Sequence, residues 1–188
     1  MCVMFKLPLR SQHRKGDGER VRHARAAPRF PMAKSVVVEQ SRAIPVAVED
    51  AFARTLPIPL ELICSRWYGP IPPIKEVRQQ TGGWDAAGQT RVVLMVGGGS
   101  AREELTSVDP PRSFGYTLSS VKGPLAPLVS SVEGKWSFSP AGTGTTVTWQ
   151  WVLHPKSAVT APVLPVFGRL WKGYARQVLE TLSEQLVG

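Results

Sequence analysis

The stretch KWSFSPAGTGTTVTWQWVLHP, residues 135–155, decides how this chain folds. It holds three of the six tryptophans, and bulky side chains alternate with polar ones on both sides of the turn signal AGTG. Such alternation with a period of two is typical of antiparallel strands that each bury one face. Trp136, Trp149 and Trp151 all fall on the face to be buried. The rings therefore meet either a packed core or a cavity that another molecule fills.

Five more segments upstream are rich in strand-forming residues and are bounded by Gly or Pro. They are residues 34–44, 74–80, 89–96, 102–108 and 112–120. Short connections between consecutive strands favour an antiparallel sheet. The glycine run VGGGS, residues 96–100, fits a hairpin turn, because it lacks the Lys-Ser/Thr ending and the following helix of a phosphate-binding loop.

Helical patterns flank these strands. Two short helices are expected at residues 46–56 and 60–67, separated by prolines. The segment 161–188 predicts a long amphipathic helix, with charged residues opposite an apolar stripe. The stripe is Phe167, Leu170, Trp171, Tyr174, Val178, Leu182 and Leu186. A seven-stranded sheet of this kind curls, and one helix must cover its apolar face, so we expect a space between them.

Length and charge set further bounds. The 188 residues suit one domain, and residues 1–31 carry +6 of the net charge of +9. We expect residues 1–31 to be a basic, disordered extension that folding does not require, and residues 32–188 to be a single domain. Because the excess of basic charge lies in the extension, no specific nucleic-acid partner is expected. No apolar run reaches the ~18 residues of a transmembrane segment.

Cysteines and histidines form no recognisable motif. Cys2 and Cys64 lie far apart, and the three histidines have no metal-ligand spacing. We therefore expect no disulfide framework, no metal and no cofactor, and we take the reducing cytoplasm as the compartment.

The order of elements, together with the phrases IPVAVEDAFA, GGWDAAGQTR, EELTSVDPPRSFGYTLSS and GTTVTWQW, resembles the SRPBCC or START-like superfamily. The resemblance covers residues 32 to about 187 and is strongest to the polyketide cyclase/dehydrase and lipid-transport-like members. It implies an α+β helix-grip fold, in which a curved seven-stranded antiparallel sheet wraps around a long C-terminal helix and two short helices follow the first strand. It also implies a cavity for lipids, polyketides or other apolar molecules. No phrase is a catalytic signature.

Strand parity and the helix stripe predict which side chains face that cavity. The predicted ligand-binding residues are Trp67, Tyr68, Met95, Phe114, Tyr116, Trp136, Phe138, Trp149, Trp151, Phe167, Trp171 and Tyr174. Arg66 is the polar candidate, since a guanidinium beside two aromatic rings could hold a carboxylate or enolate oxygen. For each residue, ordinary core packing or, for Arg66, a solvated surface position is the alternative.

Two further groups of residues are open to more than one interpretation. Trp84 lies on a loop and is expected to be a lid or a surface plug. Arg91, Glu103, Glu104 and Arg112 lie on strands whose faces the sequence does not assign, and we expect them on a solvated face. One of them turned inward would be a candidate for general acid–base catalysis.

The leading functional hypothesis is a binding or carrier protein for a hydrophobic small molecule. The second is a cofactor-free cyclase or dehydratase acting on a polyketide-like substrate, with Tyr116, Tyr174 or Arg66 as the polar participant. The third is a regulatory protein-binding module. The enzyme hypothesis requires an ionisable side chain that faces the cavity, whereas a carrier requires only apolar walls and an entrance.

Overall fold

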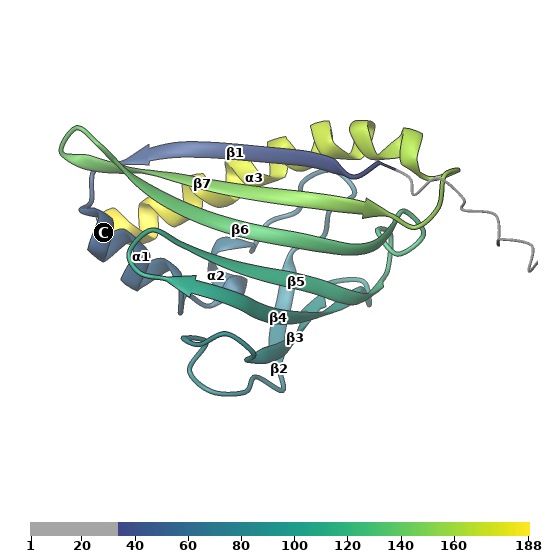
Figure 1. The fold of residues 1–188 in the computed structure, drawn as a ribbon, viewed down its shortest axis with the longest axis horizontal. Coiled ribbons are helices and arrows are strands. Elements are labelled where there is room, and N and C mark those ends of the chain that lie inside the picture. The colour runs from purple at the N-terminus through teal and green to yellow at the C-terminus, as the bar shows by residue number, and fades with distance from the viewer. Residues whose placement is uncertain (1–33) are drawn as a thin grey trace, which may run out of the picture. The chain divides into compact units, whose positions relative to one another are not determined.

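The structure is a computed structural model that describes residues 34–188. Within this range, seven antiparallel strands form one sheet in the order β1-β7-β6-β5-β4-β3-β2 (Figure 1). The strands are β1 Val36–Ile44, β2 Ile74–Arg78, β3 Thr90–Met95, β4 Ser100–Asp109, β5 Ser113–Lys122, β6 Val129–Ala141 and β7 Gly144–Pro155. The predicted strand segments are confirmed. The expectation for residues 1–31 lies outside the described residues.

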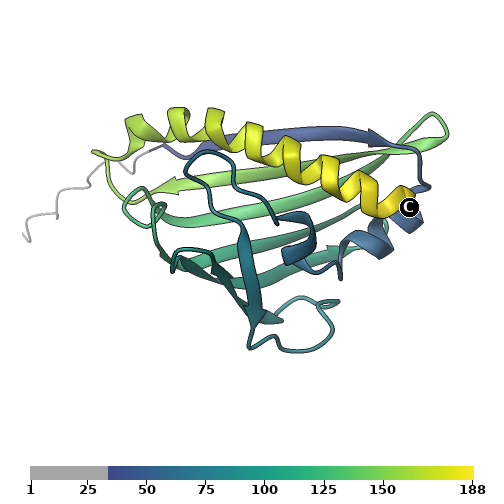
Figure 2. The ribbon, with the colours of Figure 1, turned by 180° about the vertical axis from the view of Figure 1, so that it is seen from behind.

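The helices are α1 Val48–Thr55, α2 Leu60–Ile63 and α3 Leu164–Val187, with a short 3-10 turn, η1, at Ala161–Val163. Figure 2 shows α3 lying along the concave face of the sheet, with α1 and α2 near its C-terminal half. The predicted helix-grip fold is therefore confirmed. The second short helix is shorter than expected, because the Cys64 carbonyl accepts the Ile74 N–H at 2.8 Å and the chain leaves the helix to join β2.

The sheet is strongly curved. In Figure 1, β1 follows the long axis of the molecule, whereas β2 at the other edge runs steeply across it. This curvature lets α3 pack closely against β1 at one edge while the space beneath the middle strands stays wider. At the close contact, a Cβ atom on Gly168 would lie 2.6 Å from Cγ1 of Val38, so α3 needs a glycine there.

The core has a solid end beside α1. Phe52 of α1 makes edge-on contacts with Phe114 and Phe138, at centroid distances of 6.1 and 5.5 Å. The C-terminal half of α3 adds Val178, Leu179, Leu182 and Leu186, all buried. Any cavity that the tryptophan rings face must therefore lie in the other half of the space between helix and sheet.

Candidate functional site

A cavity of about 280 Å³ lies between the N-terminal half of α3 and the concave face of the sheet. Side chains from β3 to β7 form one wall, and Phe167, Leu170, Trp171 and Tyr174 of α3 form the opposite wall. The lining is predominantly apolar, with a small number of polar groups, as is usual for small-molecule sites. The cavity thus occupies the half of the interior that the solid core leaves free.

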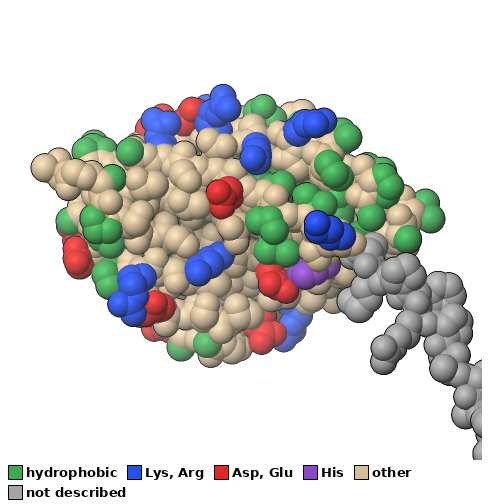
Figure 3. Space-filling view, turned by 45° about the horizontal axis from the view of Figure 1, so that its top comes forward, with side chains coloured by type: hydrophobic (Ala, Val, Ile, Leu, Met, Phe, Trp, Pro, Cys, Tyr) green, Lys and Arg blue, Asp and Glu red, His purple; other side chains and the backbone are tan. Residues whose placement is uncertain are grey.

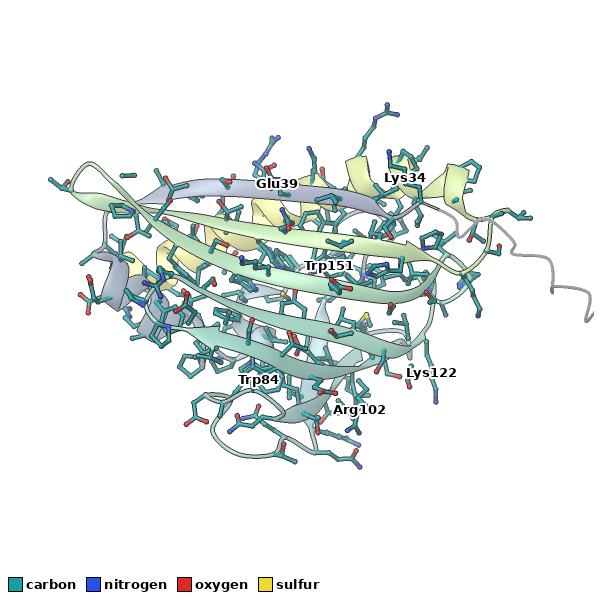
Figure 4. All side chains as sticks on the ribbon, in the orientation of Figure 1. Lys34, Glu39, Trp84, Arg102, Lys122 and Trp151 are labelled. Atoms are coloured by element: carbon teal, nitrogen blue, oxygen red, sulfur yellow. The ribbon has the colours of Figure 1, made fainter. Side chains whose placement is uncertain are left out.

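The mouth of the cavity lies where its lining reaches solvent. Ile71, Leu125, Leu128 and Phe167 of the lining are only partly buried. Lys122, at the end of β5, also borders the cavity and is exposed (Figure 4). The α2–β2 loop, the β5–β6 loop and the start of α3 therefore frame the entrance.

Nine of the residues predicted from the sequence lie in the cavity wall. They are Met95, Phe114, Tyr116, Trp136, Trp149, Trp151, Phe167, Trp171 and Tyr174. Six of them are linked by ring contacts from Phe114 to Tyr174, and within this group Trp136 stacks on Trp149 at 4.9 Å with an interplanar angle of 12°. Trp171 of α3 packs at 5.0 Å from Trp149 and 5.1 Å from Trp151.

Four of the predicted residues lie outside the cavity wall. Phe138 is buried in the solid core beside Phe52. Trp67 is 56% exposed, and the Tyr68 hydroxyl packs over Gly173 on α3. The Arg66 Nη2 donates to the Thr181 hydroxyl at 3.1 Å, which fastens the α2–β2 loop to α3 instead of facing the cavity. The loop does reach the cavity, but a few residues later, through Pro70, Ile71 and Pro72.

Tyr116 reaches the middle of the tryptophan wall because of a glycine. Gly134 of β6 is the partner of Tyr116 on β5 and of Trp151 on β7. A Cβ atom on Gly134 would overlap the Tyr116 ring, so the ring occupies the space that a side chain would fill. The Tyr116 hydroxyl then accepts two hydrogen bonds, from Nε1 of Trp149 and Nε1 of Trp151, each 2.8 Å long. This role of Gly134 was not predicted from the sequence, although a glycine between the bulky inward residues Val132 and Trp136 is a sign of close approach by another group.

Two buried polar atoms in the cavity wall have no hydrogen-bonding partner among the described residues. They are Nε1 of Trp171 and the hydroxyl oxygen of Thr55. Buried polar groups are nearly always paired in folded proteins, so these two atoms are exceptions. Both residues belong to the same cavity.

The most important departure from expectation is a buried ion pair in the cavity wall. Arg91 on β3 and Glu103 on β4 are directly opposed, and Nε of Arg91 donates to Oε2 of Glu103 at 2.6 Å. Their side chains are only 6% and 5% exposed, so the expected solvated position is wrong for both. Glu104 and Arg112 are exposed, as expected. Burial raises the pKa of the Glu103 carboxyl, against the opposing effect of Arg91.

Trp84 also differs from expectation. It is 2% exposed and lines the cavity from the β2–β3 loop, so it is not a surface residue (Figure 4). The Arg91 guanidinium carbon lies 3.8 Å from the centroid of the Trp84 ring, a cation–π contact. Trp84 therefore covers the buried ion pair on one side and closes the cavity there.

Burial keeps the remaining ionisable groups of the wall neutral. It raises the pKa of the Tyr116 hydroxyl, and the nearby Glu103 carboxylate raises it further. Burial also raises the pKa of the Tyr174 hydroxyl well above its usual value, and that of the Cys64 thiol to about 12. At neutral pH these groups therefore act as hydrogen-bonding groups and not as anions.

A second polar constellation lies away from the cavity. The Ser35 hydroxyl is 2.9 Å from Nδ1 of His154, and Nε2 of that ring is 2.8 Å from Oε1 of Glu133. The order Ser-His-Glu resembles a nucleophilic triad, which the sequence did not indicate. However, the Glu133 side chain is 60% exposed, and none of the three residues lines the cavity. The chain of contacts ties the start of β1 to β7 and β6.

The surface of the described residues carries both charged and exposed apolar side chains. On the face drawn in Figure 3, Lys and Arg side chains are interspersed with Asp and Glu. Within residues 34–188, no helix is both long enough and apolar enough to cross a membrane.

The family model for polyketide cyclase / dehydrase and lipid transport matches residues 35–187. The chain therefore belongs to this family, a branch of the SRPBCC superfamily whose fold binds hydrophobic ligands. No curated protein matches the sequence.

Several solved structures share the fold at low sequence identity. A Thalictrum flavum norcoclaurine synthase point mutant, in complex with a transition state analogue, is 14% identical, with a TM-score of 0.61 over 82% of this chain and 95% of that chain. A major latex-like protein from Panax ginseng is 13% identical, with a TM-score of 0.60 over 82% of this chain and 99% of that chain. A Mesorhizobium loti protein is 20% identical, with a TM-score of 0.54 over 82% and 96%. These similarities establish the fold and not an activity.

Proposed function

We propose that the protein binds a hydrophobic small molecule, lipid-like or polyketide-like, and acts as its carrier. The observation that supports this most is the apolar cavity of about 280 Å³ beside the solid core. Its volume lies near the lower end of the ~300–1,000 Å³ typical of ligand pockets, which favours a compact ligand. The free, buried thiol of Cys64 is compatible with a reducing cytoplasm as the place of action.

The nine predicted aromatic and Met residues of the wall are the proposed ligand contacts. Trp136 and Trp149 present stacked rings, and Trp171 closes over them from α3. A flat or cyclic apolar ligand would gain both burial and ring contacts there. Ile71, Leu125 and Phe167 at the mouth are the residues that a ligand would pass.

Binding can be tested with the apolar dye N-phenyl-1-naphthylamine. The native protein should bind one dye molecule, quench its own tryptophan fluorescence and melt at a higher temperature. Ala101→Leu, which adds bulk to a buried position in the wall, should weaken dye binding by about tenfold or more. Arg102→Leu is the matched control, because Arg102 is the next residue of β4 and is exposed (Figure 4). Equal dye affinity in both variants would contradict the proposed site.

A cofactor-free enzyme is the second candidate, and the ion pair Arg91–Glu103 is the specific observation that favours it. The wall contains a carboxyl with a raised pKa, which is what a general base or acid near neutral pH requires. In an enolisation, the Glu103 carboxylate would take a proton from the carbon next to a ketone. The C–H electron pair would move to the carbonyl oxygen, which the Tyr116 hydroxyl would stabilise by hydrogen bonding.

The two candidates predict different results with 2-acetylnaphthalene in heavy water. An enzyme should exchange the methyl protons of the ketone for deuterium faster than buffer does, and Glu103→Gln should reduce the rate to that of buffer. Binding of the ketone by the variant, and its circular dichroism, would show that the fold persists. Binding without accelerated exchange in the wild-type protein would leave the carrier function alone.

A further inference from the structure

The direction of the hydrogen bonds at Tyr116 constrains what the cavity can bind. The hydroxyl oxygen already accepts the indole N–H groups of Trp149 and Trp151, each at 2.8 Å. A phenolic hydroxyl also has one O–H to donate. Among residues 34–188 the structure gives this O–H no acceptor. The two tryptophans therefore occupy the oxygen of the Tyr116 hydroxyl as an acceptor and leave its O–H free to donate a hydrogen bond.

A second unsatisfied donor belongs to the same part of the wall. Nε1 of Trp171 has no acceptor among the described residues, although Trp171 is fully buried. Its ring packs at 5.0 and 5.1 Å from the two indole rings that bond to Tyr116. Two donors without acceptors thus lie close to the same pair of indole rings. A bound molecule with an acceptor oxygen would give the Tyr116 O–H the partner that it lacks.

The charge of the wall argues against a carboxylate as that acceptor. The Arg91 guanidinium is paired with Glu103 at 2.6 Å, so its charge is already balanced. The Glu103 carboxylate is close enough to Tyr116 to disfavour ionisation of the hydroxyl. A second anion beside it would meet the same repulsion in addition to its own desolvation cost. A neutral oxygen avoids both penalties.

We propose that the cavity selects apolar ligands that carry a neutral carbonyl oxygen, such as a ketone, ester or quinone, and that Tyr116 is the residue that recognises this oxygen. The inference deepens the proposed binding function and depends on it. Trp149 and Trp151 act as positioning residues, because they fix the direction of the Tyr116 hydroxyl. Gly134 acts in the same way, because it makes room for the Tyr116 ring.

Three ligands of similar shape test the proposal on the wild-type protein: 2-ethylnaphthalene, 2-acetylnaphthalene and 2-naphthoate. Their affinities are compared with their partitioning from water into cyclohexane, which offers no hydrogen bonds. The ketone should bind about tenfold or more tightly than its partitioning predicts relative to the hydrocarbon. The naphthoate should bind more weakly than the ketone at neutral pH.

The variant Tyr116→Phe should remove the excess affinity for the ketone and leave the hydrocarbon affinity within about threefold. If that variant does not fold, the infrared band of a ¹³C-labelled carbonyl in the wild-type complex gives an independent readout. The band should shift to lower frequency than in cyclohexane, because the carbonyl accepts a hydrogen bond.

The outcomes separate the proposal from the function on which it rests. Binding of all three ligands in proportion to their partitioning, with an unshifted carbonyl band, would overturn the carbonyl preference and leave the apolar binding function intact. Tighter binding of the naphthoate would also overturn it. Failure of the hydrocarbon and the ketone alike to bind would overturn the proposed function itself.

Discussion

Replacing Glu103 with leucine would leave the Arg91 guanidinium buried without its carboxylate. The two side chains are 6% and 5% exposed, and their hydrogen bond is 2.6 Å long, so the guanidinium would stay buried without a counter-charge. Removal of one member of a buried ion pair costs about 3–5 kcal/mol in free energy of unfolding. We expect a loss of this size for Glu103→Leu, and a similar loss for Arg91→Met.

The double variant Arg91→Met/Glu103→Leu should behave differently. Replacement of both charges by apolar groups of similar volume is often neutral or stabilising, because neither charge then has to be desolvated. The double variant loses the contact of Arg91 with the Trp84 ring, worth about 0.5–2 kcal/mol. We therefore expect its stability to be within about 2 kcal/mol of the wild type.

Urea unfolding with linear extrapolation would measure all four proteins of this cycle. A coupling energy of about 2 kcal/mol or more, with the double variant more stable than either single variant, is the expected result. Additive losses, or single losses below about 1 kcal/mol, would refute the interpretation of the two residues as a buried, coupled ion pair.

The same cycle predicts a dependence on pH. The folded protein binds the Glu103 proton more tightly than the unfolded chain, because burial raises the pKa of this carboxyl above its ordinary value of 4.5. The contribution of Glu103 to stability is therefore complete below pH 4.5 and is lost as the pH rises through the higher folded pKa. The stability difference between wild type and double variant should fall in that direction. A difference that grows as the pH rises from 4.5 would show that Arg91 outweighs burial.

Three other predictions follow from the cavity wall. Gly134→Ala should lower stability by about 1–3 kcal/mol and weaken dye binding, because its methyl group would displace the Tyr116 ring; an unchanged dye affinity in a titration would contradict this. Trp151→Ala should lower the free energy of unfolding by less than the ~3–5 kcal/mol of an aromatic truncation in a solid core, because Trp151 is half-buried and borders the cavity. A loss of the full amount, measured by denaturant unfolding, would indicate close packing instead. In a Cys2→Ser variant, Cys64, with its thiol pKa of about 12, should not react with a disulfide reagent such as Ellman's until the protein unfolds. Immediate reaction of the native variant would show an accessible thiol.

The fold could be predicted from the sequence because its signals are local. The alternation around Trp149 and the helical stripe around Trp171 each assign a buried face without knowledge of the other. Whether a given buried side chain packs in the core or lines the cavity depends on how the sheet and the helix are placed relative to each other. Phe138 and Trp136 share one face of β6, yet Phe138 packs against α1 in the solid core and Trp136 borders the cavity.

The polar part of the wall could not be predicted, because it depends on the register between strands. Arg91 and Glu103 face each other only because the turn after Met95 sets the pairing of β3 with β4. Charged residues on strands are usually solvated, so the sequence favoured an exposed position for both side chains. Trp84 is a similar case, since its loop position suggested exposure and its contact with Arg91 buries it. Such exceptions to local rules are expected where a structure has a functional site.

The measurement that tests the central claim most directly is a set of nuclear Overhauser contacts between N-phenyl-1-naphthylamine and the side chains of the native protein. The account predicts contacts from the dye to Trp149, Trp171 and Phe167 in the cavity wall, and none to Phe138 in the solid core. Contacts confined to the exposed Val159 and Val166, which are 85% and 62% exposed, would place the dye on the surface and contradict a ligand-binding cavity.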